Sequence, residues 1–203
     1  MGVVVTGVRP SLEQTDDLTA AVAAARQGDE AAFRVVYREV QPKLLRYLRV
    51  LVGDDGEDVA SETWLQVVRD LASFKGNGDS FRGWVATVGR HRAMDHLRRT
   101  RRRPAISTPV DTLVEVAGDA DTEARALESA ATDAAIALIA TLPRDQAEAV
   151  MLRAVVGLDA ETAAKVLGKR AGAVRTAAYR GLRRLAKHLD ETGEGRQASP
   201  GPP

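Results

Sequence analysis

Cysteine is absent from this chain of 203 residues, which excludes disulfides, thiolate zinc sites, iron–sulfur clusters and thiol redox chemistry. Aromatic residues are scarce, at 4% of the chain, whereas alanine, leucine and valine supply much of the 44% hydrophobic content. Such a composition favours helices that pack closely through small side chains.

Long hydrophobic runs are also missing. No uninterrupted apolar stretch approaches the ~20 residues that a membrane span needs. Residues 1–14 lack the basic segment and apolar block of an export signal. We therefore expect a soluble, cytoplasmic protein without membrane insertion.

Charge is nearly balanced over the whole chain, at a formal net charge of +1, but it is strongly segregated along it. Residues 90–103 hold seven arginines against one acid, Asp95, and residues 162–188 hold eight lysines and arginines with no acid. Between them, residues 104–133 carry seven acids against Arg125 alone. Basic charge concentrated twice on a nearly neutral chain points to a polyanionic partner.

Apolar residues recur at spacings of three and four, and no strand pattern occurs, so an all-α fold is expected. The expected helices span residues 16–27, 29–48, 58–74, 81–102, 132–141, 142–155, 159–167 and 171–189. The third helix is expected to bury an apolar side formed by Val59, Trp64, Val67, Val68 and Leu71.

The second half of the chain contains a helix-turn-helix pattern. Asp159 caps a short helix through Leu167, Gly168 closes that helix, and a long basic helix follows from Ala171. The buried stripe of the long helix is expected to consist of Val174, Leu182, Leu185 and Leu189. Its opposite side is polar and basic, as a DNA-reading helix requires.

Three segments together resemble the bacterial extracytoplasmic function (group IV, sigma-70 family) RNA polymerase sigma factors. They are Glu57-Asp58-Val-Ala-Ser-Glu62-Thr-Trp64, Phe81-Arg-Gly-Trp84 through Arg103, and Leu142-Pro143-Arg-Asp-Gln-Ala-Glu through Leu189. They are similar to sigma regions 2.2, 2.3–2.4 and 4, in the correct order and spacing. The resemblance implies two small helical domains, sigma region 2 and the helix-turn-helix of sigma region 4, joined by a flexible acidic linker.

The resemblance also implies a division of the chain into five parts. These are a disordered N-terminus (1–15), sigma region 2 (16–103), the acidic linker (104–131), sigma region 4 (132–190) and a disordered tail (191–203).

The function implied is that of an alternative sigma factor, which binds core RNA polymerase and directs promoter-specific initiation through the −10 and −35 elements. The implied partners are the clamp helices of the largest polymerase subunit, the flap region, promoter DNA and an anti-sigma factor. No cofactor, metal or enzymatic activity is expected, because no nucleophile motif, glycine-rich phosphate loop or metal-ligand cluster occurs. A stand-alone helix-turn-helix regulator is the first alternative, and a helical adaptor that binds an acidic protein is the second.

Polymerase docking is assigned by the resemblance to an acidic and polar ridge on the third helix. The candidate residues are Asp58, Ser61, Glu62, Trp64 and Gln66. The family usually has glutamine where this chain has Ser61.

Recognition of the −10 element is assigned to the loop before the fourth helix and to that helix. The candidates are Lys75, Asn77, Arg90, His91, Arg92, Arg98, Arg99 and Arg101. Arginines that neutralise phosphates add affinity by releasing counterions. His91 stands where the family commonly has asparagine, and an imidazole both stacks and hydrogen-bonds.

Recognition of the −35 element is assigned to the last helix and the turn before it. The candidates are Lys169, Arg170, Arg175, Thr176, Tyr179, Arg180 and Arg183. Arginine reads guanine edges in the major groove with two hydrogen bonds, and Thr or Tyr contacts phosphates or thymine methyls.

Overall fold

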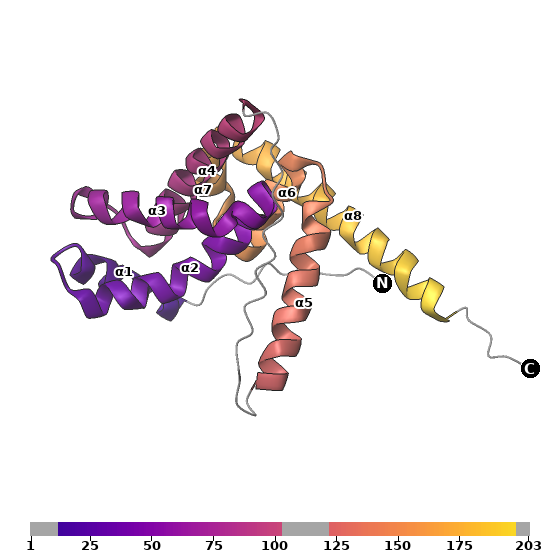
Figure 1. The fold of residues 1–203 in the computed structure, drawn as a ribbon, viewed down its shortest axis with the longest axis horizontal. Coiled ribbons are helices and arrows are strands. Elements are labelled where there is room, and N and C mark those ends of the chain that lie inside the picture. Colours follow the sequence, from indigo (N-terminus) through magenta and orange to yellow (C-terminus); the bar gives the residue numbers. More distant parts are fainter. Residues whose placement is uncertain (1–11, 103–121, 198–203) are drawn as a thin grey trace, which may run out of the picture.

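The computed structural model describes residues 12–102 and 122–197, and within these two ranges the chain is helical without a strand (Figure 1). The helices are α1 (Leu12–Ala25), α2 (Glu30–Val52), α3 (Gly56–Asp70), α4 (Gly78–Arg102), α5 (Thr122–Ala140), α6 (Arg144–Val150), α7 (Ala160–Leu167) and α8 (Ala171–Gln197). Two 3₁₀ turns, Gly53–Asp55 and Leu71–Ser73, and a π-helical turn, Met151–Val155, complete the described elements. The expected all-α fold is confirmed.

Helices α1 to α4 form a first bundle around one apolar core. Val36, Leu48, Val67 and Phe81 come from three of its helices and are fully buried there. Local signals set the helix ends, because Asp29 Oδ1 accepts a hydrogen bond from the Ala32 amide at 3.0 Å and caps α2.

Helices α5 to α8 form a second bundle that contains the expected helix-turn-helix. Asp159 Oδ1 accepts from the Thr162 amide at 2.6 Å and caps α7. Gly168, at φ +63°, ends α7 in the left-handed conformation that glycine adopts at least cost. The turn then delivers the chain into α8, whose Val174 is fully buried.

The two bundles pack against each other in the structure. Tyr47 of α2 and Ala86 of α4 belong to the same apolar cluster as Leu152, Leu158 and Ala163 of the second bundle. Helix α4 lies along α7 in the packed body, while α5 and the far end of α8 project away from it (Figure 1).

Several helix boundaries differ from the sequence expectation, and three of them fall in segments that were expected to be non-helical. Helix α1 begins at Leu12, α5 begins at Thr122 within the expected linker, and α8 continues to Gln197 into the expected tail. Alanine-rich helix formers follow Thr122, so helix propensity extends α5 across part of the acidic stretch. The remaining expected disordered and linker residues, 1–11, 103–121 and 198–203, lie outside the described residues.

Two side chains expected in the buried stripes are exposed. Val68 is 55% exposed because it follows Val67 directly, about 100° further around α3. Leu189 is 59% exposed, since α8 has by then run past the core of the second bundle.

Candidate nucleic-acid and polymerase interfaces

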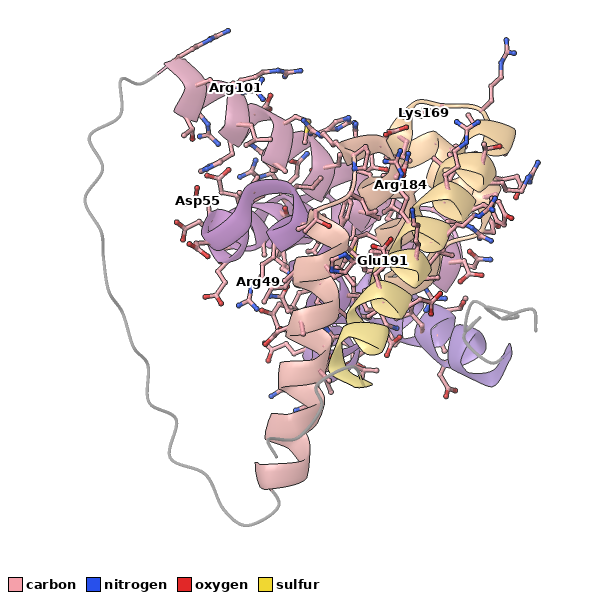
Figure 2. All side chains as sticks on the ribbon, turned by 90° about the vertical axis from the view of Figure 1, so that its right-hand side faces the viewer. Arg49, Asp55, Arg101, Lys169, Arg184 and Glu191 are labelled. Atoms are coloured by element: carbon pink, nitrogen blue, oxygen red, sulfur yellow. The ribbon has the colours of Figure 1, made fainter. Side chains whose placement is uncertain are left out.

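Helix α8 presents one exposed face of polar and basic side chains. The candidates there and in the preceding turn are all exposed: Lys169, Arg170, Arg175, Thr176, Tyr179, Arg180 and Arg183. The opposite face is buried. Val174, Ala177 and Ala178 are its most buried residues, and the expected Leu182 and Leu185 are half-buried. Lys169 stands at the turn and Arg184 lies further along the helix (Figure 2).

Small residues allow α8 to approach its neighbours closely. A Cβ atom built on Gly181 would lie 2.8 Å from Val150 Cγ2 and 3.2 Å from Leu142 Cδ1. The α6–α8 crossing therefore depends on glycine at this position. A close crossing fixes the angle at which α8 projects its exposed face.

One acid lies on this basic face. Glu161 of α7 accepts from Arg175 Nη1 at 3.1 Å, with both side chains more than half exposed. The Thr176 hydroxyl donates to the Gly172 carbonyl at 3.0 Å, which leaves Tyr179 and Arg180 projecting beyond it.

The arginines assigned to the −10 element do not share one face of α4. On the face toward α3, Arg92 donates to Gln66 Oε1 at 2.7 Å and Arg99 lies 3.4 Å from the Glu62 carboxylate. The structure thus pairs two −10 candidates with two docking candidates. His91 is exposed on another face of the helix.

Toward the end of α4 the charges are open to solvent. Arg98 is 69% exposed and pairs with Asp95 at 2.8 Å, a contact worth little in water. His96 Nε2 lies 2.9 Å from Asp55 Oδ2 on the turn after α2. Arg101 lies near the exposed end of the helix (Figure 2).

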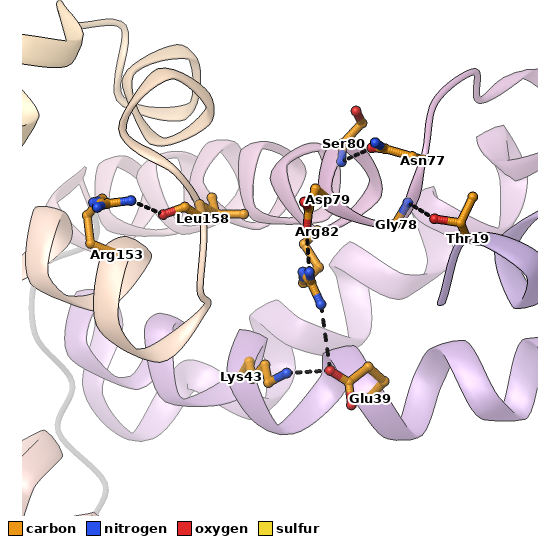
Figure 3. Close-up of polar contacts among 10 residues, drawn as sticks. All are labelled: Thr19, Glu39, Lys43, Asn77, Gly78, Asp79, Ser80, Arg82, Arg153 and Leu158. Atoms are coloured by element: carbon orange, nitrogen blue, oxygen red, sulfur yellow. Dashed lines mark hydrogen bonds and ion pairs between the residues drawn. The ribbon is translucent and has the colours of Figure 1, made fainter. Parts of the chain in front are cut away.

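The loop before α4 is held by a polar network (Figure 3). Asn77 Oδ1 accepts from the Ser80 amide at 2.9 Å, so the Asn77 side chain caps α4 while Lys75 is exposed. Gly78 N donates to Thr19 Oγ1 at 2.9 Å and ties the loop to α1.

Arg82 is a further member of this network, and the sequence reasoning missed it. Its guanidinium is 1% exposed, donates to Asp79 and lies 3.8 Å from Glu39 of α2 (Figure 3). Because Arg82 links Asp79 in the first turn of α4 to Glu39 of α2, it positions the start of α4. Its place in the arginine-rich helix gives no signal that separates it from surface arginines.

The docking candidates on α3 divide into exposed and buried residues. Asp58 and Ser61 are exposed, whereas Trp64 is only 6% exposed and donates from Nε1 to Gln41 Oε1 at 2.6 Å. The Trp64 ring also packs edge-on against Phe33, with the ring centroids 5.9 Å apart. Trp64 is therefore part of the core beneath the exposed docking candidates Asp58 and Ser61.

Two apolar side chains that the sequence reasoning did not assign to docking lie on the exposed side of α3. Leu65 is 69% exposed and Val68 is 55% exposed. Val68 also borders a groove of about 570 Å³ between α3 and the α1–α2 turn, which Phe33 and Leu71 line as well. Leu65 and Val68 thus add exposed apolar surface next to the polar docking candidates of α3.

A buried cluster of charged and phenolic groups lies where the two bundles meet. Glu148 of α6 is 3% exposed and accepts from Arg90 Nε at 2.6 Å and from Arg144 Nε at 3.0 Å. The Tyr47 hydroxyl donates to the same carboxylate at 3.4 Å. Arg90 is thus the one −10 candidate that the structure ties to the second bundle by an ion pair among the described contacts.

Burial and Glu148 shift the titration of this cluster. Burial raises the pKa of the Tyr47 phenol well above its ordinary value, and the negative charge of Glu148 adds to the effect. Burial alone would lower the pKa of Arg90, but the hydrogen bond and charge of Glu148 raise it overall. Tyr47 is therefore neutral and Arg90 charged at physiological pH.

Within residues 12–102 and 122–197, no group of three or more His, Asp or Glu side chains is placed to hold a metal ion. Among the described helices, none combines the length and the apolar character that crossing a membrane requires.

Comparison with known proteins finds matches that cover most of both bundles. The family model for sigma-70 region 2 matches residues 36–103, and the model for sigma-70, region 4, matches residues 132–185. The ECF RNA polymerase sigma factor SigD of Mycobacterium tuberculosis is 34% identical over 92% of this chain and 91% of its own length. ShbA of Streptomyces griseus, another ECF sigma factor, is 36% identical over 85% of this chain and 95% of its own.

A solved structure shares the fold. CnrH, in complex with the cytosolic domain of CnrY, superimposes with a TM-score of 0.58 over 87% of this chain and 99% of CnrH, at 24% identity. The matched regions, their order and the length of the similarity confirm the expected family. The chain belongs to the ECF RNA polymerase sigma factors and directs core RNA polymerase to promoters as an alternative sigma factor.

Proposed function

We propose that α8 reads the −35 element in the major groove. The observation that supports this is the exposed basic face of α8. Arg175 lies one helical turn before Tyr179 and Arg180 on this face, and the opposite face of the helix is buried. A helix fixed at a close α6–α8 crossing keeps these side chains in register with base edges. Lys169 and Arg170 in the turn hold the phosphate backbone.

The −10 element is assigned to α4 and the loop before it. His91 is exposed midway along the helix, and Lys75 is exposed on the loop that Asn77 and Thr19 hold in place. Strand separation requires unstacked bases to be trapped by stacking and by cations. His91 serves as the base contact, and Arg90, Arg92, Arg98, Arg99 and Arg101 serve as phosphate contacts.

Docking to the polymerase uses the exposed side of α3. Asp58 and Ser61 supply polar contacts there, and Leu65 and Val68 supply the apolar centre of the interface. Glu62 and Gln66 pair with arginines of α4, so a partner that binds them would also change the position of that helix.

A protein inhibitor is a further proposed partner. CnrH was solved with the cytosolic domain of CnrY bound, and the family resemblance implies an anti-sigma factor for this chain. The proposed function needs no catalysis, because binding energy drives promoter opening and no bond is made or broken by the chain.

Transcription of pooled genomic DNA of the source organism by core polymerase tests this proposal. Adding the chain should produce transcripts whose start sites share a −10 and a −35 sequence. The double change Arg175→Ala and Arg180→Ala should reduce these transcripts at least about tenfold, since a bidentate base contact contributes ~1–3 kcal/mol. Arg38→Ala, an exposed arginine on α2 that lies outside the groove beside Val68, is the matched control and should have no effect.

The alternatives give different results in the same experiment. A stand-alone regulator would bind DNA tightly without polymerase and would create no new start sites. An adaptor for acidic proteins would bind neither DNA nor core polymerase, and that result would refute the assignment of both DNA-reading helices.

A further inference from the structure

Arg82 of α4 is a charged side chain in a fully buried position. It is 1% exposed and is the largest of the fully buried side chains among the described residues. A buried guanidinium needs negative charge close by, because water no longer solvates it. Two carboxylates supply that charge: Arg82 donates to Asp79 in the first turn of α4, and its Nη1 lies 3.8 Å from Glu39 Oε1 on α2 (Figure 3).

The hydrogen-bond donors of Arg82 are only partly used. Among the described residues, its Nε and Nη1 atoms are buried and have no hydrogen-bond partner. The more distant carboxylate, Glu39, is shared, because it also accepts from Lys43. Without Asp79, the buried guanidinium would therefore keep one distant and shared anion. Arg82 and the Asp79 carboxylate hold each other in place.

Asp79 belongs to the segment through which the chain enters α4, residues 75–80, called the entry segment below. The backbone of the entry segment turns tightly, since a Cβ atom built on Gly76, at φ +154°, would lie 2.8 Å from Ser80 Cβ. The Gly78 amide ties the entry segment to α1. Of these contacts, only the one through Arg82 connects the entry segment to α2.

The same ion pair compensates the acid of the entry segment. Residues 75–80 contain one base, Lys75, and one acid, Asp79. The Asp79 side chain is 52% exposed, and an unpaired carboxylate at this place would repel the phosphates of a bound strand. With Arg82 beneath Asp79, the charge that the entry segment presents to DNA is set by Lys75.

We propose that Arg82 is a positioning residue for recognition of the −10 element. Its buried guanidinium holds the Asp79 carboxylate, and this contact fixes the conformation in which the entry segment meets an unstacked base. A site that reads a base has to be held within about 0.5 Å of its productive geometry. This proposal rests on the assignment of α4 and the loop before it to the −10 element.

Base selectivity in transcription tests the proposal. The full chain and core polymerase transcribe a promoter mapped from genomic DNA, and then the same promoter with each −10 base changed in turn. The ratio of the two transcript yields at the most discriminating position is the selectivity ratio, and a base that is read is preferred about fivefold or more. Asp79→Asn keeps the shape of the side chain and removes its charge, so it should lower the selectivity ratio at least about threefold.

Asp95→Asn is the matched control for this change. Asp95 pairs with Arg98 at the same spacing of three residues on the same helix, but both of these side chains are more than half exposed. The control should leave the selectivity ratio unchanged. A selectivity ratio in Asp79→Asn equal to that of the unchanged chain would overturn the proposal.

Substitutions of Arg82 separate positioning from folding. Arg82→Met removes the charge and should lower the selectivity ratio as Asp79→Asn does, and Arg82→Lys should recover part of the loss because it restores the charge. Combining Arg82→Met with Asp79→Asn should cause no further loss, since both changes remove the same contact. Additive losses would show that the two residues act independently and would refute the positioning role.

Urea unfolding of the same variants identifies a purely structural role. A lower unfolding midpoint with an unchanged selectivity ratio would assign Arg82 to folding alone and would overturn the proposal. If Arg82→Met does not fold, the selectivity ratio of Asp79→Asn decides, because that substitution is made at a half-exposed side chain.

The failure of the proposed function has a different signature. If α4 does not read the −10 element, His91→Ala will leave the selectivity ratio unchanged. If only the positioning role is wrong, His91→Ala will lower the selectivity ratio while Asp79→Asn will not.

Discussion

Arg90 donates from Nε to the carboxylate of Glu148 at 2.6 Å, although the two residues are 58 positions apart and lie on different bundles. Arg90 is one of the residues that we propose as phosphate contacts, and Glu148 is a buried acid of α6. Together they join α4 of the first bundle to α6 of the second.

The glycine at the α6–α8 crossing should be sensitive to substitution. Gly181→Ala places a Cβ atom 2.8 Å from Val150 Cγ2, and overpacking of this kind costs about 1–3 kcal/mol of unfolding free energy. Gly172→Ala on the same helix meets nothing within 4 Å and should stabilise the chain by up to about 1 kcal/mol. Urea unfolding followed by circular dichroism measures both, and equal effects of the two changes would contradict the packing described for α8.

The cap of α7 should make the helix-turn-helix sensitive to acid. The hydrogen bond from the Thr162 amide lowers the pKa of the Asp159 carboxyl below its ordinary value. A carboxyl with a lower pKa in the folded state stabilises the fold above its unfolded pKa, and this stabilisation is lost as pH falls through the folded pKa. We expect the urea midpoint to decline below about pH 4.

Two cap variants check this assignment. Asp159→Ala should cost about 1 kcal/mol at neutral pH because the amide loses its acceptor. Asp159→Asn keeps an acceptor without the titration, so its midpoint should fall less steeply in acid. An acid response identical to that of the unchanged chain would show that Asp159 is not the titrating group.

Leu65 should matter for polymerase binding and not for folding. It is 69% exposed on the docking side of α3, so Leu65→Asp should reduce capture of core polymerase at least about tenfold while the unfolding midpoint changes little. Ala23→Asp adds the same charge to an exposed position of α1 and serves as the control. Normal capture of core polymerase by the Leu65→Asp variant would show that this part of α3 does not contact the polymerase.

Glu161 should restrain binding to the −35 element. Glu161→Gln frees Arg175 from a solvent-exposed pair and removes a negative charge beside the basic face. We expect severalfold tighter binding of −35 duplex DNA at low salt and almost no change in stability, because exposed ion pairs contribute ~0–1 kcal/mol. Titrations by fluorescence anisotropy at several salt concentrations test this, and weaker binding would imply that Glu161 orients Arg175 productively.

Local signals explain how much of the fold could be predicted from the sequence. The caps Asp29 and Asp159 and the helix-ending Gly168 act within one helical turn, and all three stand where the sequence placed them. The basic face of α8 could also be predicted, because the helical period of 3.6 residues places Arg175, Tyr179 and Arg180 on one side of the helix.

Other features depend on contacts between distant segments, and these features could not be predicted from the sequence. Val68 sits one position after a core residue, and only the packing of α3 decides which of the two valines is covered. Arg82 is buried and lies near Glu39 of α2. Its sequence neighbours are typical of a surface arginine, so the sequence gives no sign of this burial. The Arg90–Glu148 pair needs two bundles to meet, and no periodicity within either one predicts that.

Energy transfer between two dyes tests the central claim most directly. Pro42→Cys and Ala154→Cys place labels on exposed positions of the two bundles, where α2 packs against the π-helical turn, in a chain without other cysteines. The account predicts efficient transfer in the free chain and a marked loss of transfer when core polymerase and promoter DNA are added together. Transfer that stays the same in an actively transcribing complex would contradict the proposed binding of the two bundles to separate promoter elements.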